Sequence, residues 1–180
     1  MAFTRMDYPS EVVVSFVRRN YNGVSGKWKI RCLDLGCGWG NNLRFLRSEG
    51  FNVYGIDLLE DAVSGLRKEF GKNVICGNMN KLPFPGEYFD FCLDRSSIQH
   101  NSREDIHQIH REVYRVLKPG GRFFSMAIKS GYADAPATHL DVQDIGTLFA
   151  KYHHYDVDYL RITRNGRTED FTHYLISAVK

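Results

Sequence analysis

The first feature of the sequence that could bind a ligand is a run of alternating glycines with a carboxylate in front of it. Residues 33–40 read Leu-Asp-Leu-Gly-Cys-Gly-Trp-Gly. The glycines allow the backbone to bend sharply and let a ligand lie directly against the main chain. The loop is G-x-G-x-G rather than the dinucleotide G-x-G-x-x-G, and the carboxylate of Asp34 would repel a pyrophosphate. The pattern therefore indicates a ligand that is cationic at this end.

Two further groups could hold a nucleoside. Asp57 follows Gly40 by 17 residues, and its carboxylate can accept hydrogen bonds from both hydroxyls of a ribose. Asn78, in Gly77-Asn78-Met79, could pair with an adenine edge, because its amide oxygen accepts from an exocyclic amine while a backbone N–H donates to the ring. The three groups together fit three parts of one ligand.

Two histidines could act as a base beside that ligand. His100 comes soon after the expected strand 89–93, and His139 lies in an expected loop over residues 130–140. An imidazole titrates near neutral pH, so either could take a proton from a reacting group. Each also has a plain alternative: His100 could hydrogen-bond the start of the next helix, and His139 could be a solvated loop side chain.

A metal site is not expected. His107 and His110 lie three residues apart on a predicted helix and could join His100 around a metal ion. They flank the apolar stripe of that helix, however, and no carboxylate is placed with them to complete a ligand set.

The elements that must position these residues alternate between strand and helix. Short apolar runs predict buried strands, and apolar residues three and four apart predict helices. The expected strands cover residues 29–35, 52–56, 73–76, 89–93, 122–128, 157–163 and 171–179. The expected helices cover 11–21, a segment from a cap at Asn41 or Asn42 to 49, 59–70, 103–118 after a cap at Ser102, and 142 to about 152 after a cap at Asp141. A tight turn at Asn165-Gly166 would join the last two strands.

This order predicts an α/β fold. We expect a doubly wound, seven-stranded Rossmann-like sheet, mostly parallel with an antiparallel C-terminal hairpin strand, and helices on both faces. Ligands of such sheets bind at the carboxyl ends of the strands, where the candidate residues fall. Residues 1–180 are expected to form one domain, in which the N-terminal helix within residues 1–24 builds part of the pocket for a second substrate.

Composition narrows the classes of protein. The 180 residues carry a net charge of +3, which is too mild to predict a nucleic-acid partner. No uncharged apolar run is long enough to span a bilayer, and the amino terminus has no apolar leader segment. The four cysteines lack C-x-x-C spacing and are expected to be small hydrophobic residues in a reducing compartment. These features favour a cytoplasmic protein with no membrane partner.

Four stretches of the sequence, in order and at matching spacing, resemble the class I S-adenosylmethionine-dependent methyltransferases. They are LDLGCGWGNN at 33–42, GID at 55–57, GNMNKLPFPGEYFDFCLD at 77–94 and YRVLKPGGRFFS at 114–125. The resemblance covers nearly the whole chain and implies that the cofactor is S-adenosylmethionine. It is strongest with the compact type that acts on small molecules.

The resemblance also implies roles for individual residues. Asp34 and the loop from Gly36 to Gly40 would hold the methionine moiety, Asp57 the ribose, and Asn78 with Met79 the adenine. Many relatives carry an acidic residue at position 78, and here the Asn78 amide oxygen would replace it. The predicted cofactor-binding set is Asp34, Gly36, Cys37, Gly38, Asn42, Asp57, Leu58, Asn78, Met79, Asp94 and Arg95, of which Asp94 and Arg95 would flank the reacting methyl group. His100 and His139 are the predicted catalytic residues.

The acceptor is less constrained than the cofactor. The Asn-Pro-Pro-aromatic motif of base-modifying relatives is absent, because the fourth strand continues as Leu-Asp-Arg-Ser at 93–96. The segment SSIQHN at 96–101 is similar to compact bacterial enzymes that act on sugars or small metabolites. We predict in-line methyl transfer to a hydroxyl, or to an amine, of a small polar acceptor. Tyr8, residues 95–101 and residues 132–139 would line the acceptor pocket.

Other functions remain open from the sequence. The chain could be a cofactor-binding but inactive partner subunit, a nucleic-acid or protein methyltransferase, or a nicotinamide-dependent dehydrogenase. A core this small could also form a homodimer to complete its pocket.

Overall fold

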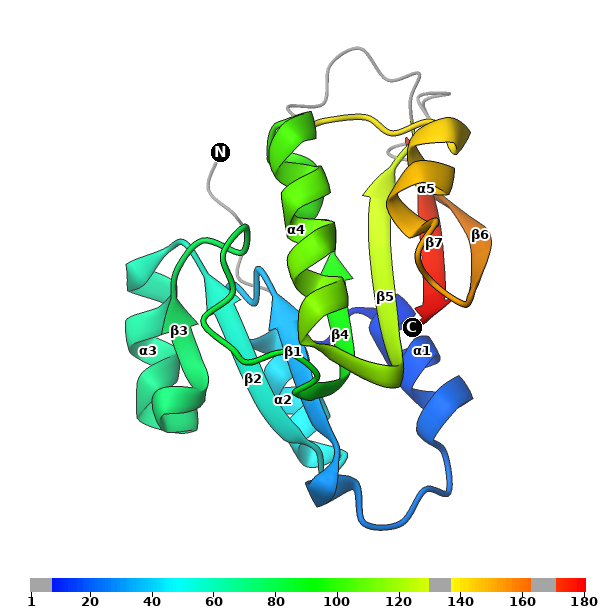
Figure 1. Cartoon of the computed structure of the whole chain (residues 1–180). Helices are drawn as coiled ribbons and strands as arrows, with labels where there is room; N and C mark the ends of the chain where they lie inside the picture. The colour runs from blue at the N-terminus through cyan, green and yellow to red at the C-terminus, as the bar shows by residue number, and fades with distance from the viewer. Residues whose placement is uncertain (1–7, 130–136, 163–170) are drawn as a thin grey trace.

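The structure is a computed structural model that describes residues 8–129, 137–162 and 171–180 (Figure 1). Its strands are β1 (Arg31–Leu35), β2 (Asn52–Asp57), β3 (Val74–Cys76), β4 (Phe89–Arg95), β5 (Leu117–Ile128), β6 (His154–Ile162) and β7 (Phe171–Val179). Its helices are α1 (Glu11–Tyr21), α2 (Asn41–Ser48), α3 (Glu60–Phe70), α4 (Arg103–Val116) and α5 (Val142–Phe149), with short 3₁₀ turns η1 (Lys27–Lys29), η2 (Gly71–Asn73) and η3 (Ile98–His100).

The strands form one seven-stranded sheet in the order β3-β2-β1-β4-β5-β7-β6. The first five strands pair in parallel, and β7 pairs antiparallel with both β5 and β6. The predicted fold class is therefore confirmed. The order reverses between β1 and β4, so the carboxyl ends of these strands frame the crevice in which such sheets bind ligands.

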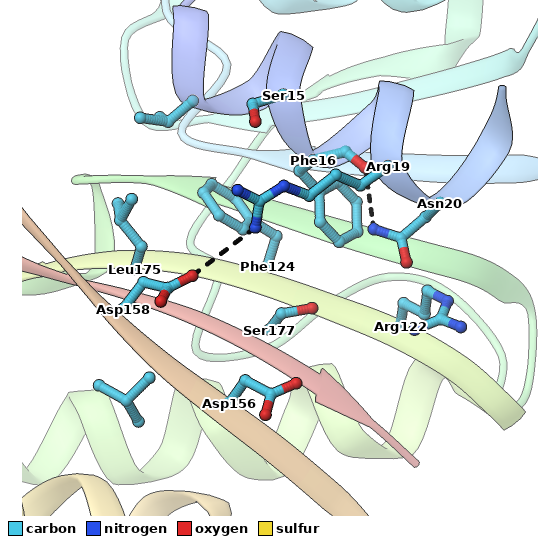
Figure 2. Close-up of a pocket in the computed structure, with 12 residues that line it drawn as sticks. Ser15, Phe16, Arg19, Asn20, Arg122, Phe124, Asp156, Asp158, Leu175 and Ser177 are labelled. Carbon is cyan, nitrogen blue, oxygen red and sulfur yellow. Dashed lines mark hydrogen bonds and ion pairs between the residues drawn. The ribbon is translucent and has the colours of Figure 1, made fainter.

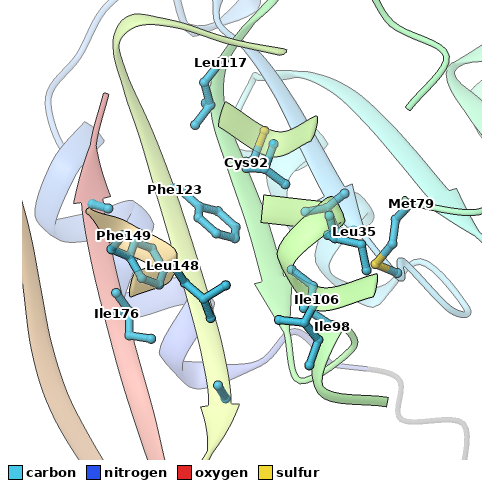
Figure 3. Close-up of a cluster of buried hydrophobic side chains, with 14 of the residues drawn as sticks. Leu35, Met79, Cys92, Ile98, Ile106, Leu117, Phe123, Leu148, Phe149 and Ile176 are labelled. Carbon is cyan, nitrogen blue, oxygen red and sulfur yellow. The ribbon is translucent and has the colours of Figure 1, made fainter. Parts of the chain in front are cut away.

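Two apolar cores lie on the two faces of the sheet. Helices α4 and α5 cover one face, where Phe123 and Phe149 are buried among the side chains shown in Figure 3. Helices α1, α2 and α3 cover the other face, where Phe16 of α1 packs on Phe91 and Phe124 with ring centroids 6.0 and 5.1 Å apart. Burial on both faces explains why the central strands are short solid apolar runs.

The helix caps agree with the sequence only in part. Ser102 accepts a hydrogen bond from the Asp105 amide at 3.1 Å, and Asp141 forms a complete capping box with Asp144. Asn42 is not a cap: α2 begins after Gly40, whose backbone is left-handed, and the Asn42 Oδ1 accepts from the Ser10 amide at 3.1 Å. This bond places the start of α1 beside the glycine loop.

Two strands begin earlier than predicted. β5 starts at Leu117, because this residue pairs with Phe89 before an irregularity carries the strand through Pro119 and the two glycines. β6 starts at His154, since it pairs with Val179 at the far end of the hairpin. The expected turn at Asn165-Gly166 lies outside the described residues.

A groove of about 470 Å³ separates α1 from strands β5, β7 and β6 (Figure 2). The ion pair between Arg19 and Asp158, 3.7 Å long, crosses it. Its lining includes Arg122 and Ser177, which lie toward the amino end of β5. Leu175, which pairs with Met126 nearer the carboxyl end of β5, also lines it, so the groove follows much of the length of β5.

No helix in the described ranges combines the length and apolar character needed to cross a membrane. All four cysteines are free thiols, and Cys32, Cys37 and Cys92 are buried as expected of small hydrophobic residues. Burial raises the pKa of the Cys37 thiol well above its usual range, so this thiol stays protonated.

Candidate cofactor and acceptor site

The carboxyl ends of β1, β2 and β4 bring the predicted cofactor residues together. Leu35, the last residue of β1, pairs with Ile56 on one side and with Asp94 on the other. The glycine loop that follows β1 therefore lies between Asp57 at the end of β2 and the turn that follows β4. Parallel pairing alone creates this arrangement, since it sets the carboxyl ends of the three strands along one edge.

The glycine loop is fastened to β2 by main-chain hydrogen bonds. The amides of Gly36 and Cys37 both donate to the Ile56 carbonyl, at 2.8 and 3.1 Å. The Gly38 amide donates to Asp57 Oδ2 at 2.7 Å, and the Leu59 amide donates to Asp57 Oδ1 at 2.9 Å. The Asp57 carboxylate is thus held in one orientation. Each of its oxygens can accept a further bond, which is what a ribose diol requires.

Glycine is required at two positions of this loop by different neighbours. Gly36 has φ +67°, and a Cβ there would lie 2.2 Å from Ser97 Oγ. Gly40 has φ +82°, and a Cβ there would lie 2.4 Å from a methyl carbon of Leu66. At Gly38, by contrast, a Cβ would meet no atom within 4 Å, although φ is +50°. The main chain of the loop is therefore open at Gly38, where a ligand can approach it.

Asp34 is a buried carboxylate with an unused oxygen. Its side chain is 1% exposed, and its Oδ2 has no hydrogen-bond partner among the described residues. Its pKa is raised to about 8, first by burial and then by the nearby carboxylates of Asp94 and Asp57, while a hydrogen bond with Asn42 opposes the shift. A buried oxygen without a donor is costly, so this one indicates a cationic ligand.

Asp94 supports the turn after β4. Its Oδ1 accepts from the amides of Ser97 at 2.8 Å and Ile98 at 3.1 Å, and its Oδ2 accepts from Ser125 Oγ at 2.8 Å. Burial raises its pKa to about 6, while these three bonds lower it. Arg95, predicted to flank the methyl group with it, is exposed, and the described residues show no ion pair between the two.

The turn itself is strained and anchored. Ser96 has φ +58°, a left-handed conformation that non-glycine residues seldom adopt. Its amide donates to the Met126 carbonyl at 3.1 Å, and the Ser97 hydroxyl donates to the Gly36 carbonyl at 3.3 Å. The turn after β4 is therefore fixed both to β5 and to the glycine loop.

The predicted adenine and ribose neighbours lie on the same edge. Asn78 is exposed, and its Oδ1 accepts from the Asn80 amide at 3.0 Å, so its amide oxygen already has one local partner. Met79 is 6% exposed and belongs to the core on the α4 face. Leu58 is 58% exposed directly after Asp57, and Trp39 is 40% exposed in the glycine loop. Exposed apolar side chains at this edge are suited to pack on a nucleoside.

The two predicted catalytic histidines differ in their surroundings. His100 is exposed at the end of η3, with its amide 3.2 Å from the Ser97 carbonyl. His139 is half-buried, and its Nε2 is buried without a partner in the described ranges. The Thr138 amide donates to the Gln99 carbonyl at 2.7 Å, so the segment before α5 lies against η3.

A third histidine at this edge was missed by sequence reasoning. His173 on β7 is 8% exposed and pairs with Ile128 at the carboxyl end of β5. Its Nδ1 is buried and has no partner among the described residues, and burial, with a smaller effect of Arg95, lowers its pKa. Neighbouring Lys129 donates its amide to the Thr172 carbonyl and bridges to Leu140. His139 and His173 thus lie on the two sides of this strand end.

A protein-family model described as a methyltransferase domain matches residues 33–125, slightly more than half of the chain. The chain belongs to this methyltransferase family. This confirms the resemblance to class I S-adenosylmethionine-dependent methyltransferases inferred from the sequence. The match spans the glycine loop, β2, β4, α4 and the part of β5 up to Ser125.

Curated relatives match the methyltransferase domain over a fraction of their own length. "24-methylenesterol C-methyltransferase 2" of Oryza sativa subsp. japonica is 36% identical over 103 residues, which cover 53% of this chain and 28% of the relative. "Fatty-acid O-methyltransferase" of Mycolicibacterium smegmatis is 33% identical over 136 residues, covering 68% of this chain and 48% of the relative. The chain therefore spans between about a quarter and a half of these proteins.

The fold has solved counterparts. A SAM-dependent methyltransferase from Archaeoglobus fulgidus superposes with a TM-score of 0.72 at 18% identity, covering 94% of each chain. At this level of identity the likeness establishes the fold of the methyltransferase domain.

The residues of the site fit S-adenosylmethionine. The three carboxylates Asp34, Asp57 and Asp94 lie close enough for the second and third to raise the pKa of the first. No lysine or arginine forms an ion pair with any of the three in the described ranges. A ligand that carries both an ammonium and a sulfonium would supply the missing positive charge, and its ribose would meet an oriented Asp57.

Proposed function

We propose that this domain transfers the methyl group of S-adenosylmethionine to a hydroxyl, or to an amine, of a small polar molecule. The observation that carries the proposal is the buried Asp34 Oδ2, which has no partner in the part of the chain that the structure describes and which precedes a glycine loop that is open at Gly38. A nicotinamide dinucleotide would bring a pyrophosphate to this point, which a buried carboxylate disfavours.

Different residues of the chain would bind different parts of S-adenosylmethionine. Asp34 would hold the ammonium group, the main chain around Gly38 the rest of the methionine moiety, and Asp57 the ribose. Leu58 would pack on the nucleoside, and Met79 would support that contact from the core. The Asn42 side chain hydrogen-bonds Asp34 and accepts from the Ser10 amide. It would serve as a positioning residue for Asp34.

Bound S-adenosylmethionine supplies a methyl group on a sulfonium that is already activated for displacement. The protein then needs to orient the acceptor in line and exclude water, and orientation of this kind accounts for several kcal/mol of a barrier. We place Arg95 and Ser96, after β4, at the acceptor side. Asp94 would act through them by fixing the turn, as its three hydrogen bonds indicate.

We further propose that the acceptor is polar. Within the described ranges, His139 and His173 each keep one buried ring nitrogen without a partner, at the strand end next to the turn after β4. An acceptor hydroxyl or amine would satisfy these nitrogens, and a neutral imidazole could take its proton. His100, exposed at the end of η3, remains the alternative base. The relative named as a fatty-acid O-methyltransferase supports an oxygen acceptor, and the relative named as a sterol C-methyltransferase supports a small-molecule one.

The remaining expectations stay proposals. Residues 1–180 would form a single functional unit, in which the start of α1 lines the acceptor side, because Ser10 lies against Asn42. Much of the predicted acceptor loop, residues 130–136, lies outside the described part of the chain. A cytoplasmic location, the absence of a nucleic-acid partner and homodimer formation likewise stay proposals.

The test is incubation of the protein with S-adenosylmethionine labelled in its methyl group and with a fractionated metabolite extract. We expect label in small polar molecules, together with stoichiometric S-adenosylhomocysteine. The matched control is Asp57→Ala, which should stay folded but lose cofactor affinity at least tenfold. Label that appears only in nucleic acid or protein would refute the small-molecule acceptor. Cofactor binding without any S-adenosylhomocysteine would instead favour an inactive partner subunit.

A further inference from the structure

A second cleft lies on the opposite face of the sheet from α1, between α4 and α5. Its volume is about 310 Å³, and residues 107–114 of α4 and 147–152 at the end of α5 line it. These residues lie along the middle and end of α4, whereas the predicted cofactor site is at the carboxyl edge before α4 begins. The cleft is therefore separate from the methyl-transfer site, and nothing in the proposed function uses it.

Two residues that line this cleft each carry a buried polar atom with no partner among the described residues. One is Nδ1 of His110, whose side chain is 6% exposed, and the other is the hydroxyl of Tyr152, which is 7% exposed. Buried polar groups are almost always hydrogen-bonded, because removal from water without a replacement is unfavourable. One of these groups lies on α4 and the other in the bend that follows α5, and a ligand in the cleft would satisfy both.

The rings that carry these atoms are held in place by aromatic neighbours. His110 meets Phe149 and Phe123 edge to face, with ring centroids 5.0 and 5.5 Å apart. Tyr152 lies 5.3 Å from Phe149 and 5.2 Å from Tyr114. Phe149 therefore contacts the rings of both His110 and Tyr152, and Figure 3 shows it beside Phe123 and Leu148 in the core. Both polar side chains are therefore held in place by packed aromatic rings.

The mouth of the cleft is positively charged. Arg111 and Lys151 are exposed, and both line the cleft. The guanidinium of Arg111 donates to the neutral Gln108 Oε1 at 2.7 and 3.0 Å, and neither cation has a carboxylate partner in the described ranges. Asp144, the carboxylate of α5, is already paired with Arg103. An anionic group at the mouth would therefore meet two unpaired charges.

We propose that the cleft between α4 and α5 binds a small organic anion. The ligand would be about one ring in size, with a hydroxyl that reaches His110 and Tyr152 and a carboxylate that stays at the mouth with Arg111 and Lys151. A hydroxyl suits the deep end because it can donate to one of these groups and accept from the other. Burial lowers the pKa of His110 to about 3, so its imidazole is neutral and can accept.

The experiment uses 4-hydroxybenzoate as the probe, with benzoate and phenol as matched ligands that lack the hydroxyl or the carboxylate. Binding is measured by isothermal titration, and the ring nitrogens of His110 are followed by NMR. We expect 4-hydroxybenzoate to bind at least tenfold more tightly than either control ligand and to shift the His110 resonances. Absence of binding, or binding that leaves His110 unperturbed, overturns the proposal.

Two variants and a control locate the contacts. Tyr152→Phe removes the buried hydroxyl alone and should weaken 4-hydroxybenzoate about tenfold, to the level of benzoate. Lys151→Gln should weaken it and make the remaining affinity less dependent on salt. Tyr159→Phe, at an exposed tyrosine on β6, is the matched control and should change nothing.

The free protein gives an independent readout. Tyr152→Phe should be at least as stable as the original chain without ligand, because it removes an unpaired buried hydroxyl. A loss of stability would mean that this hydroxyl is already satisfied within the fold, which overturns the proposal even if the variant binds poorly. Cofactor binding should be unchanged in both variants, so failure here is distinguishable from failure of the methyl-transfer proposal.

Discussion

Binding of S-adenosylmethionine should depend on pH through Asp34. The pKa of this carboxyl is raised to about 8, mainly by burial, so most molecules of the free protein carry it protonated at pH 7. A cationic ligand binds best to the ionised form. With a pKa of about 8, about 1% of the carboxyl is ionised at pH 6 and half at pH 8, so affinity should rise about fiftyfold, or about 2.3 kcal/mol, over that range.

The assay is isothermal titration in buffers of different ionisation enthalpy. At pH 7 the complex should release about 0.9 proton, because about nine-tenths of the carboxyl is protonated before binding. S-adenosylhomocysteine keeps the ammonium group and should behave in the same way. Methylthioadenosine lacks the amino-acid part, and its binding should release no proton at this site.

Asp34→Asn is the matched variant, since it keeps the shape and removes the charge. It should bind S-adenosylmethionine at least tenfold more weakly at pH 8 and with no pH dependence between pH 6 and 7.5. The raised pKa also means that the original chain loses stability as pH rises from about 4 to about 8. The variant should lose less stability over this range, because only the contribution of Asp94, whose pKa is raised to about 6, remains. An original chain whose affinity is flat from pH 6 to 8 would refute the reasoning.

Three more predictions concern the same edge of the sheet. Gly36→Ala should destabilise the fold by about 2 kcal/mol more than Gly38→Ala, measured by denaturant unfolding. Both glycines have positive φ, but only a Cβ at position 36 would meet a neighbouring side chain. Equal losses of stability in the two variants would contradict this geometry. His173→Gln should lower the rate of methyl transfer at least tenfold with cofactor affinity unchanged in titration, and parallel losses of both would make it a folding residue. Ser125→Ala should lower the free energy of unfolding by about 1–3 kcal/mol in thermal unfolding, and by more at pH 8 than at pH 5. The reason is that protonated Asp94 depends less than the carboxylate on the hydrogen bond that the Ser125 hydroxyl donates. A loss of stability that is independent of pH would count against this.

Most of the fold could be predicted because its signals are local. Solid apolar runs bounded by glycines predicted the central strands, and capping residues such as Ser102 and Asp141 fixed helix starts. The starts of β5 and β6 were wrong because they depend on pairing with distant partners. Leu117 is held by Phe89, and His154 by Val179, and neither pairing leaves a mark in the sequence around it.

The candidate site could likewise be predicted from the sequence only where its signals are local. The glycine loop and Asp57 could be found because main-chain geometry and one carboxylate per strand end have recognisable spacing. Asn42 was expected to cap a helix and bind cofactor, yet its partners Ser10 and Asp34 come from other elements. His173 was missed because a polar residue in a strand predicts a solvent-facing side chain. In the structure β7 lies between β5 and β6, and the His173 side chain is buried.

The contact between Gly36 and Ser97 links the glycine loop after β1 to the turn after β4. The serine side chain occupies the space that a Cβ at position 36 would need, and its hydroxyl donates to the Gly36 carbonyl. A change in the turn after β4, which we propose lies at the acceptor side, would therefore disturb the loop proposed to hold the cofactor. Laboratory selection for new acceptors should leave Ser97 unchanged and collect its successful substitutions on β7 and in the segment before α5 instead.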